Sequence, residues 1–99
     1  MNKYEIIEKL RKSKTSLLTL FGIEKIGLFG SYAKDCATVA SDIDLVYVTK
    51  EGVRIGFGQK IQLEEYLQHL LQTAKIDLVN YKHINPIIRK DVEKYIIYV

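Results

Sequence analysis

Apolar positions near the start of the chain recur with a spacing close to the helical period. Over residues 4–21 they fall every three or four positions, which predicts one amphipathic helix that buries a single face. Gly22 follows and is a typical helix terminator. Residues 25–29 (KIGLF) then have the pattern of a short strand, and we expect a sharp turn at Gly30 and Ser31.

The middle of the chain predicts a second strand between two less regular segments. Residues 42–49 (DIDLVYVT) are rich in Val, Ile and Tyr, the composition of a largely buried strand. Residues 32–41 mix small and polar side chains, so we expect a weak helix followed by a loop. Residues 50–58 hold three of the six glycines and predict a mobile loop or irregular hairpin that could serve as a lid.

The last part of the chain repeats the alternation of helix and strand. Leucines in 60–73 mark one helical stripe, and 75–81 (KIDLVNY) has the pattern of a third strand. Asn85 and Pro86 supply the N-cap and first-turn proline of a final helix, followed by a short apolar tail at 95–99. The sequence therefore predicts one α/β domain over residues 1–99.

Composition narrows the classes of protein that remain. The chain is 47% hydrophobic and 27% charged, as folded proteins are, and its net charge of +3 suits an anionic ligand such as a nucleotide without predicting direct nucleic-acid binding. The chain contains no run of about 18 apolar residues, so the sequence predicts no membrane span. The lone Cys36 excludes an internal disulfide, favours the cytoplasm and is expected to be a small packing residue.

Three aspartates lie in or beside apolar strands and predict a metal site. Asp42 and Asp44 are expected to project from one face of their strand, where their like charges repel unless a cation neutralises them. Asp77 is embedded in the next strand, where a lone buried carboxylate is costly. If the two strands are neighbours, the three carboxylates can hold two magnesium ions about 4 Å apart, an arrangement used for in-line phosphoryl transfer.

The Gly-Ser pair at 30–31 predicts a phosphate contact. It follows a strand and precedes a possible helix, so backbone N–H groups can face an anion and the missing glycine side chain allows close approach. Alone, each motif is weak, because Gly-Ser is common in plain loops and Asp-x-Asp in turns. Their order is the stronger signal.

That order, Gly-Ser at 30–31, ten residues, then Asp-Ile-Asp at 42–44, resembles the signature of the DNA polymerase β-like nucleotidyltransferase superfamily, and specifically of its minimal nucleotidyltransferase branch. The stretch LFGSYAKDCATVASDIDLVYV is similar to that branch's core block, and the similarity continues through KIDLV to the closing IIYV. The resemblance implies the nucleotidyltransferase fold, an α/β (α+β) architecture with a small mixed β-sheet flanked by helices.

The resemblance also implies a role for each motif residue. Gly30 and Ser31 would hold the triphosphate of ATP, Asp42 and Asp44 would ligate two Mg²⁺ ions, and Asp77 would be the third catalytic acid. The chain would then be a magnesium-dependent nucleotidyltransferase with ATP as its substrate.

Four other polar side chains lie near the motifs or could bind a ligand. Asp35 stands where the family usually has glycine, and its charge is unfavourable near a triphosphate unless it points outward. Lys34 is a candidate phosphate contact, with an ordinary solvated lysine as the alternative. His69 and His83 are expected to be surface or partly buried histidines rather than a shared metal site.

Minimal members of the family are commonly paired with a HEPN ribonuclease toxin. The resemblance therefore implies an antitoxin that transfers AMP from ATP to a hydroxyl of that partner, expected to be a tyrosine. Two alternatives stay open: a non-catalytic antitoxin that neutralises the toxin by binding, and an enzyme that modifies a small molecule of the aminoglycoside type.

Overall fold

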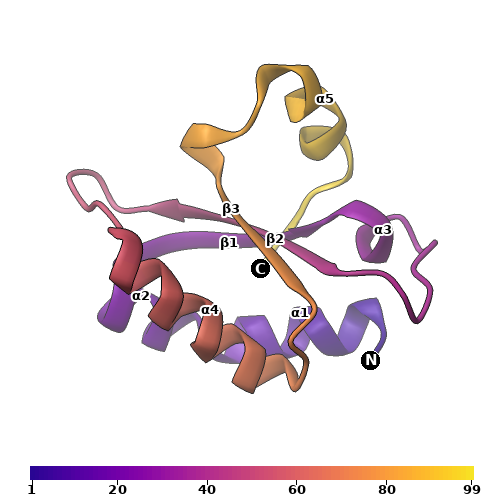
Figure 1. Ribbon diagram of the computed structural model, residues 1–99, viewed down its shortest axis with the longest axis horizontal. Helices are drawn as coiled ribbons and strands as arrows, with labels where there is room; N and C mark the ends of the chain where they lie inside the picture. Colours follow the sequence, from indigo (N-terminus) through magenta and orange to yellow (C-terminus); the bar gives the residue numbers. More distant parts are fainter.

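The computed structural model describes all 99 residues and has a four-stranded mixed sheet with helices on both faces (Figure 1). In chain order the elements are α1 (Lys3–Lys12), α2 (Lys14–Phe21), β1 (Ile23–Phe29), α3 (Gly30–Ala33), β2 (Ile43–Thr49), α4 (Phe57–Leu71), β3 (Ile76–Asn80), the 3-10 helix η1 (Tyr81–His83), α5 (Pro86–Tyr95) and β4 (Ile97–Tyr98). The expected small mixed sheet flanked by helices is confirmed.

The sheet has the strand order β3-β2-β1-β4. β1 pairs antiparallel with both β2 and β4, whereas β2 and β3 are parallel. Parallel neighbours need a crossover connection, and α4 provides it between β2 and β3. The two strands that carry the aspartates are therefore adjacent, which the sequence pattern leaves open.

The two faces of the sheet are covered unequally (Figure 1). A cluster of 14 buried residues joins one face to α1, α2 and α4, and it includes Leu45 of β2 and Leu67 of α4. A cluster of three, Val46, Ile84 and Val92, joins the other face to α5. Because side chains alternate along a strand, Asp44 lies on the face that only α5 covers.

The helix predicted over residues 4–21 is two helices that meet at Ser13. Ser13 is 7% exposed, and its backbone N–H donates to the carbonyl of Leu10 at 3.0 Å. Leu10 and Leu17 both stay in the core, so the apolar spacing does not reveal the break. Leu18 and Leu20, which lie beside the buried stripe, are 43% and 61% exposed.

Two further segments refine their predictions. The stretch before β2 is a short helix followed by a loop, as predicted, but the helix spans only Gly30–Ala33 and begins two residues earlier than expected. The apolar tail contains β4, which pairs Tyr98 with Gly27 and Ile97 with Leu28. Two residues are too few to show an alternating pattern, so this strand depends on the free edge of β1. None of the helices combines the length and the apolar composition that crossing a membrane requires.

Candidate active site

The acidic side chains expected to act together lie at the start of β2 and β3. The parallel register places Asp44 directly opposite Asp77. Asp42 precedes β2 by one residue, and the next backbone N–H, that of Ile43, donates to the carbonyl of Lys75 at 2.8 Å. Asp44 is intermediate in exposure, whereas Asp42 and Asp77 are exposed. The structure thus brings together two strand starts that are 33 residues apart in the chain.

Asp44 has an electrostatic environment that disfavours its charged form. Burial, followed by the negative charges of Asp77 and Asp42, raises the pKa of Asp44 from 3.8 to about 6. The three ion pairs of the chain use Asp35, Glu8 and Asp91 as their acids, so no lysine or arginine neutralises the site. A bound cation would remove this repulsion.

Gly30 lies directly against Asp44. Its φ of +72° is in the left-handed region, and a Cβ built on it would lie 2.0 Å from Oδ2 of Asp44. Glycine is therefore required at this position for two reasons, the left-handed backbone conformation and the close approach of the Asp44 carboxylate. Ser31 follows in the first turn of α3, so the Gly-Ser turn lies beside the Asp44 carboxylate.

The donor set suits a hard divalent cation. Magnesium is commonly held by one or two carboxylates, with substrate phosphates and water completing its shell, and Asp42 and Asp44 offer carboxylates beside a glycine turn. No three His, Cys, Asp or Glu side chains are close enough to hold a metal ion by themselves. The cluster of three metal-ligating aspartates therefore stays a prediction. Without a bound cation the three carboxylates repel one another, so their side chains are expected to lie apart.

Lys34 is engaged with α5. Its Nζ lies 3.0 Å from Oδ2 of Asp91 and 4.8 Å from the ring centroid of Tyr95. The hydrogen bond to Asp91 raises the pKa of Lys34. These contacts tie the end of α3 to α5, and a role for Lys34 at a phosphate stays a prediction.

Asp35 has a left-handed backbone conformation, which suits the glycine that the resemblance leads us to expect at this position. Its φ is +59°, in the left-handed region, which glycine enters without strain. Its Oδ2 accepts from Nζ of Lys3 at 2.8 Å, and its side chain is 69% exposed. The additional carboxylate is thus paired with α1 at the surface.

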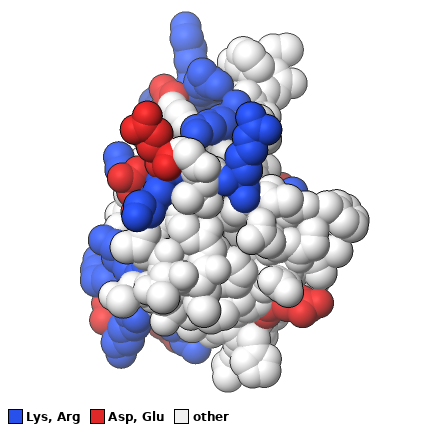
Figure 2. Space-filling model, turned by 90° about the vertical axis from the view of Figure 1, so that its left-hand side faces the viewer, with Lys and Arg blue, Asp and Glu red and all other residues white.

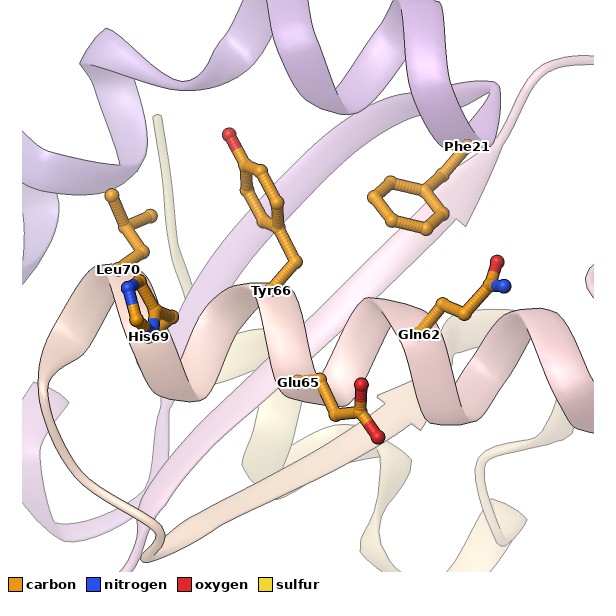
Figure 3. Close-up of a pocket in the computed structure, with 6 residues that line it drawn as sticks. All are labelled: Phe21, Gln62, Glu65, Tyr66, His69 and Leu70. Atoms are coloured by element: carbon orange, nitrogen blue, oxygen red, sulfur yellow. The ribbon is translucent and has the colours of Figure 1, made fainter.

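His69, His83 and Cys36 lie outside the acidic site. His69 lines a cavity of about 490 Å³ with Phe21 and Tyr66, between α2 and α4 on the opposite face of the sheet (Figure 3). His83 ends η1. Cys36 is free and exposed, so the expectation that it is a packing residue is wrong; the loop before β2 leaves it at the surface.

Replacing Gly30 with alanine tests the contact with Asp44. Gly30→Ala adds left-handed strain of about 1–2 kcal/mol and also forces the Asp44 carboxylate to move. Gly52→Ala is the matched control, because Gly52 has a φ of +82° and a Cβ added there would meet no atom within 4 Å. We expect urea unfolding to show a clearly larger loss of stability for Gly30→Ala; equal losses would contradict the contact.

The raised pKa of Asp44 predicts a pH-dependent stability in metal-free buffer. The folded protein holds the Asp44 proton more tightly than the unfolded chain, so this contribution to stability is complete below pH 3.8 and is lost as the pH rises through about 6. Asp44→Asn should therefore gain stability over the parent between pH 4 and 7, on the order of 1 kcal/mol once solvent screening is allowed for.

Urea unfolding at each pH measures this difference. Glu51→Gln removes the same charge at the opposite end of β2 and controls for net charge. A difference between Asp44→Asn and the parent that does not change with pH would show that Asp44 is not destabilised by its neighbours.

Comparisons with known proteins agree with this geometry. The sequence profile of the nucleotidyltransferase domain family matches residues 10–99. A provisionally named protein adenylyltransferase of Methanocaldococcus jannaschii is 41% identical over 96 residues, which cover 96% of this chain and 95% of the relative. The protein adenylyltransferase MntA of Thermococcus cleftensis is 36% identical, with coverage of 96% and 93%.

Solved structures show the same fold. A structure described provisionally as a minimal nucleotidyltransferase is 28% identical, has a TM-score of 0.75 and covers 98% of this chain and 95% of its own. The MNT antitoxin in complex with a tri-AMPylated HEPN toxin of Shewanella oneidensis is 22% identical, with a TM-score of 0.59 and coverage of 98% and 67%. The chain belongs to the nucleotidyltransferase domain family, in its minimal branch.

Proposed function

We propose that this chain, acting as one catalytic unit over residues 1–99, transfers AMP from ATP to a hydroxyl group of a partner protein. The observation that carries the proposal is the half-buried Asp44 carboxylate, which lies opposite Asp77 and against Gly30 without a basic partner. A site that keeps uncompensated acids beside a glycine turn suits a magnesium–nucleotide complex better than it suits packing.

Each residue has a role in the proposed transfer. Gly30 and Ser31 would receive the triphosphate through backbone N–H groups and the serine hydroxyl. Asp42 and Asp44 would hold Mg²⁺, which when bound lowers the pKa of a ligated hydroxyl and neutralises charge on the leaving group. Asp77, exposed beside Asp44, would orient the acceptor hydroxyl.

The reaction itself is a displacement at phosphorus. The acceptor oxygen forms a bond to the α-phosphorus of ATP, the bond from that phosphorus to the α–β bridging oxygen breaks, and pyrophosphate leaves with the electron pair. The hydroxyl proton passes to solvent by way of Asp77. Most of the acceleration would come from positioning and from electrostatic stabilisation of the developing charge.

The relatives support a protein as the acceptor. Two of them are named as protein adenylyltransferases, and the Shewanella complex holds an AMPylated HEPN toxin. We therefore propose that the partner of this chain is a HEPN-type toxin, that the acceptor is a tyrosine hydroxyl, and that the chain acts as the antitoxin by modifying that partner.

Intact-protein mass spectrometry tests the transfer. After incubation with this chain, ATP and magnesium, the HEPN partner should gain one or more AMP increments. The double substitution Asp42→Ala with Asp44→Ala should abolish them, as should EDTA. Glu24→Ala with Glu51→Ala removes two exposed carboxylates far from the site and should leave the increments unchanged.

Two outcomes would contradict the proposal. Increments that persist in the Asp42→Ala, Asp44→Ala variant would place the chemistry elsewhere. Neutralisation of the toxin by that variant at the level of the parent, with no AMP adduct in either case, would make the chain a non-catalytic antitoxin that acts by binding.

A further inference from the structure

A second polar cavity lies at the far end of the strands that carry the acids. One part of it, about 490 Å³, lies between the loop after β2 and the start of η1, and a smaller part of about 220 Å³ adjoins it along β3. The two parts share Ile55, Asn80 and His83. We call them together the β3-end pocket.

The β3-end pocket is basic. Arg54, Lys60 and Lys82 line it together with His83, and no carboxylate does. None of the three cations forms an ion pair. Burial, and to a smaller extent the nearby negative charge of Glu64, raises the pKa of Tyr47, a residue that also lines the pocket. Figure 2, seen from the side of this loop and η1, shows several Lys and Arg side chains in the upper part of the face, with acidic side chains beside them.

The pocket lies on the same strand pair as the acidic site. Asp44 is opposite Asp77, and three residues further along Tyr47 is opposite Asn80. At about 3.3 Å per residue, the two register positions are about 10 Å apart. Val79, which lines the pocket, shares a face of β3 with Asp77. Tyr47 and Leu78 line it from the other face, so the pocket spans the edge of the sheet. A nucleotide held by the long basic side chains can therefore extend toward the acids.

The toxin of the Shewanella complex is tri-AMPylated. We propose that in this chain the β3-end pocket binds the phosphate of an adenylate already attached to the acceptor and so positions that adenylate for each further transfer. This inference rests on the proposed function. A transferred AMP leaves a phosphodiester anion, which the basic side chains can pair with, and a ribose that carries hydroxyl groups.

In the further transfer the same kinds of bond form and break as in the first. A ribose hydroxyl oxygen of the attached adenylate bonds to the α-phosphorus of a second ATP, the bond to the α–β bridging oxygen breaks, pyrophosphate leaves with the electron pair and the hydroxyl proton passes to solvent. The pocket takes no part in these bonds. Arg54 and Lys82 are positioning residues that hold the anion of the previous adenylate.

Binding in the absence of metal tests the pocket without any transfer. With EDTA present, 5′-AMP should shift the backbone NMR signals around Arg54 and Lys82, and the Asp42→Ala, Asp44→Ala variant should bind it as the parent does. Arg54→Gln with Lys82→Gln should weaken binding about tenfold. Lys25→Gln with Lys90→Gln removes the same charge from positions outside the pocket and should not.

Inorganic phosphate, used as a second probe, separates a nucleotide site from a general anion site. We expect it to bind more weakly than 5′-AMP. Equal affinity for the two probes, or no shift near Arg54 and Lys82 with 5′-AMP, would overturn the assignment.

The order of mass increments on the HEPN partner tests the role in repeated transfer. Arg54→Gln with Lys82→Gln should form the first AMP adduct at the parent rate and slow the later adducts about tenfold. An equal loss at every increment, or no loss at any, would overturn the proposal. If the parent forms no adduct, the proposed function fails. The binding of 5′-AMP then still decides whether the pocket is a nucleotide-binding site.

Discussion

The parallel pairing of β2 with β3 is the constraint on which the site depends. It sets Asp44 opposite Asp77, and the adjoining turn of β1 into α3 brings Gly30 against the same carboxylate. Parallel neighbours require a crossover, so α4 and its buried leucines, Leu63, Leu67 and Leu71, are part of what holds the two acids together. The repulsion among the acids opposes this arrangement, and a magnesium–nucleotide complex would relieve it.

Unequal covering of the sheet leaves the site open. Three helices bury one face through a cluster of 14 residues, whereas α5 covers part of the other through Val46, Ile84 and Val92. β3 lies at the edge of the sheet, with Asp77 at its start and the basic pocket at its end. The same edge can thus serve the nucleotide and an acceptor-linked phosphate without a change in the core.

Much of this arrangement is predictable from the sequence, and the exceptions have physical causes. Asp42 and Asp44 stand at the start of a strongly apolar strand, so their alternation is visible in the sequence, whereas the adjacency of β3 depends on packing through α4. β4 is too short to show a pattern, and the break at Ser13 keeps the apolar spacing intact. The β3-end pocket escapes sequence reasoning because Arg54, Lys60 and Lys82 are dispersed along the chain and converge only in the fold.

The location of metal and nucleotide tests the central claim most directly. A crystal structure of the chain with Mn²⁺ and a non-hydrolysable ATP analogue would give the metal position from anomalous scattering. We expect the metal at the carboxylates of Asp42 and Asp44, with the triphosphate on the Gly30–Ser31 turn. A metal bound elsewhere, or a triphosphate remote from that turn, would contradict the assignment of the active site.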